Sequence, residues 1–141
     1  MSLERLTGIL ADPSGVDFWS DVLISDAEAL LETFDQESWE QLGRQWRGWE
    51  PEWKLRLAEC LTGVQVSHAT ALLANLILEE DGRIAQTAAA GLRFQDPLPS
   101  GKLVESLVAR IQALRKTSDQ FDAHSLDLTL ASLGAVLTGV H

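Results

Sequence analysis

Apolar residues recur at every third or fourth position along most of the chain, and this spacing constrains the fold more than any other feature of the sequence. Leu3, Leu6 and Leu10 show it close to the N-terminus. Such spacing gathers apolar side chains on one face of an α-helix. No run of strictly alternating apolar and polar residues marks a β-strand, and the sequence contains no tyrosine. The sequence therefore predicts an all-α fold.

Prolines, glycines and capping residues divide this pattern into separate helices. Ser14 with Asp17 resembles a capping box, and Ser25 with Glu28 forms a complete one. Pro51 is expected to begin a new helix, because proline is favoured at the first helical position and disfavoured inside a helix. The predicted helices cover residues 3–10, a segment after Ser25, and then 38–47, 51–62, 67–80, 83–93, 102–116 and 120–138.

The chain of 141 residues is long enough for one domain and one hydrophobic core. We expect a single domain, 1–141, in four parts. Acidic helices cover 1–37, two helix pairs cover 38–93, a loop covers 94–101, and a last helix pair covers 102–141. The loop is indicated by the run DPLPSG, which contains two prolines and a glycine.

The central part of the chain contains an internal repeat. When the helix after Pro51 is superimposed on the helix after Gly82, equivalent residues differ by a constant offset of 31 positions. The last helix can be added less well, with Leu126, Leu130 and Ala131 in the corresponding places. The matched pairs in the first two copies are Trp53 with Ile84, Leu57 with Ala88, Ala58 with Ala89, and Leu61 with Leu92.

The second copy, EEDGRIAQTAAAGL at 79–92, resembles the short bacterial HEAT-like repeat first described in phycobilin lyases. It has the acid in the turn, Asp81, the aliphatic Ile84, two small residues, Ala88 and Ala89, and then Leu92. The resemblance implies antiparallel helix pairs stacked as a short, right-handed α-solenoid, in which each pair buries its faces against its neighbours.

Two features depart from that family. It usually has an arginine after the aliphatic residue, where this chain has Ala85, or Lys54 in the earlier copy. The period of 31 residues is also shorter than the roughly 40–47 residues of standard HEAT units. An irregular helical bundle is the alternative fold.

The formal net charge of −10 is distributed unevenly. Residues 1–40 contain ten acidic residues and one basic residue, whereas residues 41–141 contain eleven acidic and ten basic residues. Nucleic acid is not expected as a ligand, because a phosphate-binding surface needs positive charge. An acidic surface attracts a basic protein and accelerates its association. The alternative is a surface that serves only solubility.

A cluster of tryptophan and basic residues lies between residues 44 and 56. Both residue types are enriched at the energetic centres of protein interfaces. We expect Trp39, Trp46 and Trp53 to be core residues. Trp49 follows Gly48 in a turn, so we expect it to be the most exposed tryptophan. The alternative for the basic residues is salt bridging to the acidic N-terminal helices.

No catalytic, metal or cofactor site is predicted. His68, His124 and His141 are not within helical reach of one another, and no zinc-protease motif occurs. Cys60 falls at a core position of its helix and is expected to be a structural thiol. The sequence shows no serine-nucleophile motif and no glycine-rich phosphate loop. We therefore do not expect an enzyme.

The favoured function is a non-catalytic protein-binding module. Small acidic helical proteins of this kind resemble bacterial immunity proteins, which cover the active site of a cognate toxin. A phycobilin-lyase-like or other small-ligand-binding protein, and a regulatory or scaffold subunit, are the alternatives. The residues expected to bind a basic partner are Asp17, Asp21, Asp35, Glu37, Glu40, Arg47 and Trp49.

A cytoplasmic location without membrane insertion is expected. The N-terminus lacks the basic and apolar regions of a signal peptide, and the uncharged stretch 128–140 is too short to cross a bilayer. The single cysteine excludes an intrachain disulfide.

Overall fold

A computed structural model describes residues 2–13, 15–95, 98–99 and 101–138, and every regular element in these ranges is helical. The all-α prediction is therefore confirmed. A π-helical segment, η1 (Trp19–Leu23), and a 3-10 turn, η2 (Trp46–Gly48), accompany the α-helices. The α-helices are α1 (Ser2–Leu10), α2 (Val16–Phe18), α3 (Ile24–Glu32), α4 (Gln36–Gln45), α5 (Pro51–Leu61), α6 (Ser67–Ile77), α7 (Gly82–Leu92), α8 (Lys102–Thr117) and α9 (Gln120–Thr138).

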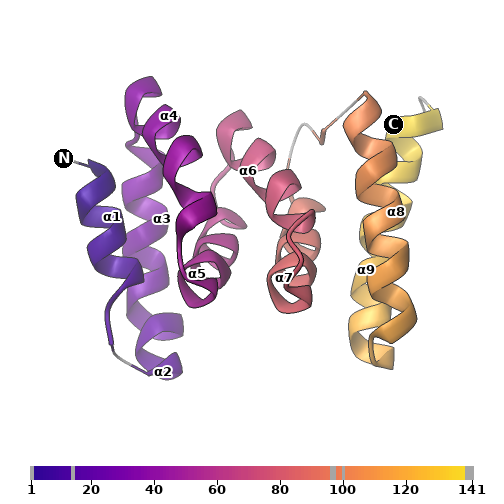
Figure 1. The fold of residues 1–141 in the computed structure, drawn as a ribbon, viewed down its shortest axis with the longest axis horizontal. Coiled ribbons are helices and arrows are strands. Elements are labelled where there is room, and N and C mark those ends of the chain that lie inside the picture. The colour runs from indigo at the N-terminus through magenta and orange to yellow at the C-terminus, as the bar shows by residue number, and fades with distance from the viewer. Residues whose placement is uncertain (1, 14, 96–97, 100, 139–141) are drawn as a thin grey trace.

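The helices pack in pairs, and the pairs follow one another from α1 at one end of the molecule to α8 and α9 at the other (Figure 1). Helices α3, α5, α7 and α9 contact one another in that order. On the other side, α1 contacts α4 and α6 contacts α8. These contacts fit a stack of helix pairs, and the right-handed HEAT-like form of that stack stays a prediction.

The prediction that a helix begins at Ser25 is wrong. Helices α2, η1 and α3 run on from one another over 16–32, and Ser25 lies inside α3. Leu23, which precedes α3, has helical backbone angles and makes no side-chain cap. Trp19 and Leu23 are both buried, so the core-facing residues continue through the expected boundary. The other proposed capping residue, Ser14, lies outside the described residues.

Two later helix starts follow ordinary capping rules. Helix α4 begins at Gln36, two residues earlier than expected, because the carboxylate of Asp35 accepts a hydrogen bond from the Ser38 backbone N–H at 2.8 Å. This bond also holds the pKa of Asp35 below its usual value. Pro51 begins α5 as predicted. Of the predicted loop 94–101, residues 96–97 and 100 lie outside the described part, and Gly101 has a φ of 82° that favours glycine.

The tryptophans divide between the core and its edge. Trp39 and Trp46 are buried as predicted, and so is Trp19. The prediction that Trp53 is a core residue is wrong, because it is only half-buried at the edge of the core. Trp49 is also half-buried, and its ring meets that of Trp53 edge to face at 5.6 Å. These two rings therefore cover each other.

Burial supports the 31-residue repeat in its first two copies. Apart from Trp53, every matched residue in α5 and α7 is buried. The last helix follows the pattern poorly, because Ala131 is exposed and Leu130 is half-buried. Leu126 and Leu133 are the buried leucines of α9, and the side chain of Leu137 lies outside the described part.

Helices α5 and α7 approach each other closely at Gly91. A Cβ atom placed on Gly91 would lie 2.2 Å from the Thr62 Oγ1 atom and 3.2 Å from the Thr62 Cβ atom. Thr62 itself is held by a hydrogen bond from its hydroxyl group to the Ala58 carbonyl oxygen. The approach of the two helices therefore requires glycine at position 91.

We predict that Gly91→Ala destabilises the protein by about 1–2 kcal/mol, because the added methyl group overpacks this seam. Gly43→Ala in α4 is the matched control, since nothing lies within 4 Å of its added Cβ atom. That control should stabilise the protein by up to about 1 kcal/mol, through helix propensity. Urea unfolding measures both free energies. If the two substitutions changed the free energy of unfolding in the same direction, the close approach of α5 and α7 at Gly91 would be contradicted.

Candidate functional site

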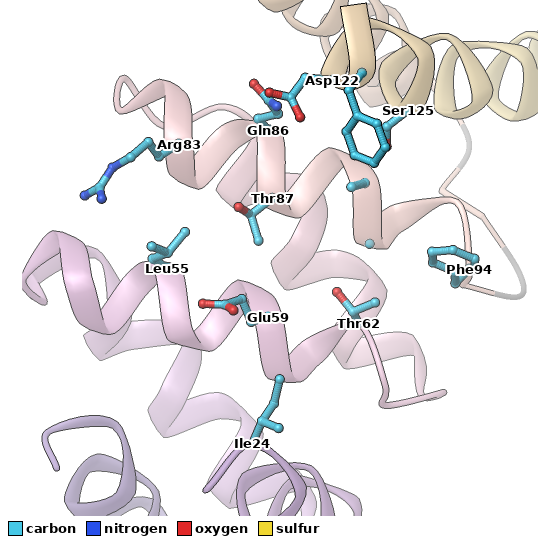
Figure 2. Close-up of a pocket in the computed structure, with 13 residues that line it drawn as sticks. Ile24, Leu55, Glu59, Thr62, Arg83, Gln86, Thr87, Phe94, Asp122 and Ser125 are labelled. Carbon is cyan, nitrogen blue, oxygen red and sulfur yellow. The ribbon is translucent and has the colours of Figure 1, made fainter. Parts of the chain in front are cut away.

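An open groove of about 660 Å³ lies over the surface of α5 and α7 and reaches α3 and α9 (Figure 2). Its lining includes small side chains, among them Thr62, Thr87, Ala90, Gly91 and Ser125. Thr62 and Gly91, which meet in the close approach of α5 and α7, thus also line the groove. The larger lining residues are Ile24, Leu55, Glu59, Arg83, Gln86, Phe94, Phe121 and Asp122.

Two acidic side chains reach the groove, Glu59 from α5 and Asp122 from α9. Glu59 is half-buried, and no ion pair to it occurs in the described ranges. Burial raises the pKa of Glu59 above its usual value, and the nearby Trp19 indole N–H and Arg56 guanidinium oppose that rise. Arg56 is already engaged, since it donates hydrogen bonds to the carbonyl oxygens of Leu10 and Asp12. Glu59 is thus a partly desolvated carboxylate that faces the groove.

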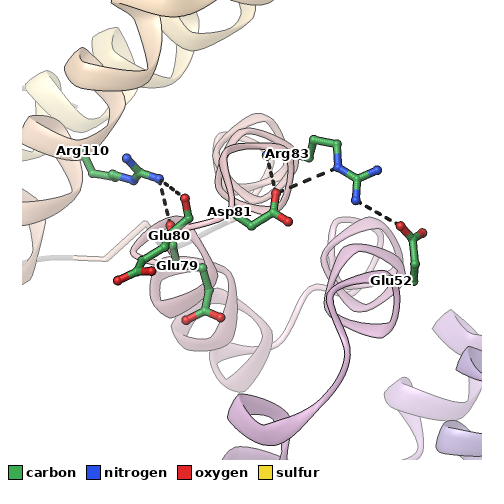
Figure 3. A network of polar contacts seen from close by, with 6 residues as sticks. All are labelled: Glu52, Glu79, Glu80, Asp81, Arg83 and Arg110. Carbon is green, nitrogen blue, oxygen red and sulfur yellow. Dashed lines mark hydrogen bonds and ion pairs between the residues drawn. The ribbon is translucent and has the colours of Figure 1, made fainter.

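The one basic residue among those lining the groove is Arg83. Its guanidinium group pairs with Glu52 at 3.0 Å and lies 4.0 Å from Asp81 (Figure 3). These carboxylates balance the charge of Arg83, so Glu59 and Asp122 carry the remaining charge among the lining residues. The Arg93 guanidinium group lies beside the groove, 4.5 Å from the centre of the Phe94 ring.

Two exposed phenylalanines border the groove. Phe94 is 55% exposed and Phe121 is 84% exposed, so both present large apolar surface to solvent. Large exposed aromatic side chains beside a groove are typical of binding surfaces. The arrangement is therefore suited to binding a ligand that offers both apolar surface and positive charge.

Buried hydrogen bonds fix the segments that carry these two phenylalanines. Next to Phe94, the buried Gln95 donates from its amide to the Leu61 carbonyl oxygen and accepts from the Thr70 hydroxyl group. In α9, the Thr129 hydroxyl group donates to the Ala89 carbonyl oxygen at 2.8 Å. The end of α7 and the helix that carries Phe121 are thereby held in place, and the groove is largely formed in advance.

The predicted acidic partner-binding residues are all exposed, but they form two groups. Asp17 and Asp21 lie in α2 and η1, whereas Asp35, Glu37 and Glu40 lie at the start of α4. The eleven helical residues 22–32 lie between the two groups, which corresponds to a rise of roughly 16 Å. Helix α2 and the start of α4 accordingly lie at opposite ends of α3 (Figure 1). The structure does not gather these residues into one site.

Arg47 and Trp49 lie away from the groove. The Arg47 guanidinium group lies 4.8 Å from the centre of the Trp46 ring and donates a hydrogen bond to the Asn75 side chain at 3.3 Å. Arg47 lines a smaller pocket of about 210 Å³ between α4 and α6, together with Trp39 and His68. The Trp39 and His68 rings stack in that pocket with centroids 5.3 Å apart.

Several other basic residues bridge neighbouring helices. Lys54 pairs with Glu79, and Arg115 pairs with Asp127. Arg110 donates hydrogen bonds from α8 to the carbonyl oxygens of Glu79 and Glu80 at the end of α6 (Figure 3). These acidic partners all lie outside the first 40 residues, so these contacts do not involve the N-terminal acids.

Cys60, His68 and His124 are not among the residues that line the groove. Cys60 is completely buried, and burial raises the pKa of its thiol group far above the usual value. Within the described ranges, no group of three or more histidine, cysteine or acidic side chains could hold a metal ion. His141 lies outside these ranges. No described helix is long and apolar enough to cross a membrane.

No family model, curated protein or solved structure matches the chain. The candidate site is therefore defined by its own geometry.

Sequence reasoning did not identify Glu59, Phe94, Phe121 or Asp122. These residues are far apart in the sequence and come from three separate segments. The available signal was weak: Phe94 follows a predicted helix, and Phe121 lies at the start of the last helix. Neither belongs to the apolar face that the helical spacing defines.

We predict that Glu59→Gln stabilises the protein at neutral pH by less than about 1 kcal/mol, since the carboxylate is only partly buried. The folded state raises the pKa of Glu59 above the usual 4.5, so the charged form opposes folding. The advantage of the variant should shrink as the pH falls toward 4.5, because the wild-type carboxyl group becomes increasingly protonated. Urea unfolding across this range measures the difference. An advantage that grows on acidification would contradict this account.

Proposed function

We propose that this protein is a non-catalytic module that binds a basic protein partner. The observation that carries the proposal is the segregation of charge. Among the described residues, Asp17, Asp21, Asp26 and Glu37 are exposed and form no ion pair, whereas most basic residues of the later helices contact other parts of the same chain. The negative charge is thus left for an external partner.

The position of the acidic residues supports recognition over a broad surface. They lie at both ends of α3, and the groove adds two further carboxylates beside the neighbouring helices. A partner with positive charge spread over its surface could meet complementary charge at several of these positions. Such complementarity raises association rates and disfavours acidic partners.

A more specific form of the proposal is a bacterial immunity protein of HEAT-like architecture, acting in the cytoplasm. Such a protein would cover the active site of a toxin, and a toxin that cleaves nucleic acid is basic because its substrate is a polyanion. The size, charge and helix pairing of this chain support this form, and the single cysteine is consistent with a reducing compartment.

Binding of a small molecule, as in a phycobilin-lyase-like protein, is the second candidate function. The groove favours it, because about 660 Å³ falls within the usual range of ligand pockets, roughly 300–1,000 Å³. Trp19 lies next to Glu59 and provides a fluorescence signal. Quenching by a bilin pigment, abolished by substitutions in the groove, would favour this function over protein binding. A regulatory or scaffold subunit is the remaining alternative.

We predict that reversing three N-terminal charges, Asp17→Lys, Asp21→Lys and Glu37→Lys, slows association with the native partner by about tenfold at low salt. The partner is first captured from the native host with the wild-type protein. Its association rate is then measured by surface plasmon resonance at several salt concentrations, and circular dichroism confirms that each variant is folded.

The matched control reverses three exposed acids in the rest of the chain, Glu50, Glu80 and Glu105, and so changes the net charge equally. This control should slow association much less. If both variants slowed association equally, the effect would come from the net charge of the protein and not from the position of the N-terminal acids. Failure to capture any specific partner would contradict the proposed function.

A further inference from the structure

The groove is lined by residues of four helices. It extends across the row formed by α3, α5, α7 and α9, and packed helices are roughly 8–10 Å apart. The row therefore spans roughly 24–30 Å. A helical segment of 14 residues is about 21 Å long and fits this span. The open shape thus favours a segment of polypeptide chain over a compact small molecule.

The charge within the groove favours a basic occupant. Glu59 lies in the middle of the groove and Asp122 projects toward it from α9 (Figure 2). Arg83 is already paired with Glu52, so it offers little attraction to an acidic ligand. A lysine or arginine side chain that entered the groove would compensate the partly desolvated Glu59, and charge-assisted hydrogen bonds are among the stronger polar interactions.

The apolar residues favour an amphipathic occupant. Phe94 and Phe121 are the most exposed large apolar residues in the described part of the chain, and both line this one groove. The partly buried Ile24 and Leu55 add apolar surface on the α3 and α5 sides. Aromatic residues that become covered in an interface contribute much of its binding energy.

We propose that the groove over α5 and α7 is the docking site for a basic, amphipathic helical segment of the partner protein. The apolar face of that segment covers Phe94 and Phe121, and its lysine or arginine side chains pair with Glu59 and Asp122. This inference rests on the proposed function and specifies the element of the partner that the protein recognises. The N-terminal acids then steer the partner, while the groove holds it.

The test uses a fluorescently labelled 14-residue helical peptide of leucine and lysine with an amphipathic pattern. A peptide with glutamate in place of lysine is its counterpart. Fluorescence anisotropy measures the affinity of each for the full chain. The lysine peptide should bind and the glutamate peptide should not. Glu59→Gln and Phe121→Ser should each weaken binding at least fivefold, and Glu59→Gln should also reduce the salt dependence.

Two control substitutions lie outside the groove. Leu128→Ser changes another exposed apolar residue of α9, and Glu105→Gln removes an exposed carboxylate of α8. Both should leave the affinity within about twofold. Phe121 is 84% exposed, so Phe121→Ser should remain folded, and its urea unfolding confirms this.

The remaining outcomes separate this inference from the proposed function. In one outcome, the N-terminal charge reversal weakens peptide binding while Glu59→Gln and Phe121→Ser have no effect. That result would overturn the inference that the groove is the docking site and would leave the acidic surface as the binding site. Absence of binding to the lysine peptide would overturn the inference and count against a basic partner. If hexylammonium at the same concentration as the peptide displaced it completely, the occupant of the groove would be a small organic cation and the inference of a helical segment would be overturned.

Discussion

The close approach of α5 and α7 is the constraint on which the rest of the structure depends. Small side chains make it possible, and at Gly91 the contact with Thr62 leaves no room even for a methyl group. The same seam joins the N-terminal helices to the C-terminal pair, because α5 contacts α3 on one side and α7 contacts α9 on the other. It also lines part of the groove. Stability and binding geometry are therefore set by the same few residues.

A second feature of the structure is the unequal use of charge, because most basic side chains contact other parts of the chain whereas many acidic side chains are exposed. Basic side chains are used internally: Arg56 binds carbonyl oxygens at the end of α1, and Arg110 does the same at the end of α6. Such contacts satisfy helix ends that would otherwise lack partners. They also remove positive charge from the surface. Exposed N-terminal acids such as Asp17, Asp21 and Glu37 form no ion pair among the described residues, which is why we infer a basic partner.

Sequence reasoning predicted the parts of the fold that depend on local rules. The helical class, the start of α5 at Pro51 and the burial of Trp39 and Trp46 followed from periodicity and proline chemistry. It failed where tertiary packing overrides a local signal, as at Ser25, where buried residues carry the helix through a capping motif. The groove could not be predicted, because periodicity identifies the buried face of each helix but not which exposed faces of distant helices converge.

A nuclear magnetic resonance titration with the leucine–lysine peptide tests the central claim most directly, because it locates binding on the folded chain without any substitution. The account predicts that backbone amide shifts change at Glu59, Thr87 and Asp122, which lie on three different helices and all line the groove. Residues of the pocket between α4 and α6 should change little. Shift changes confined to that pocket, or to the N-terminal acids alone, would contradict the account.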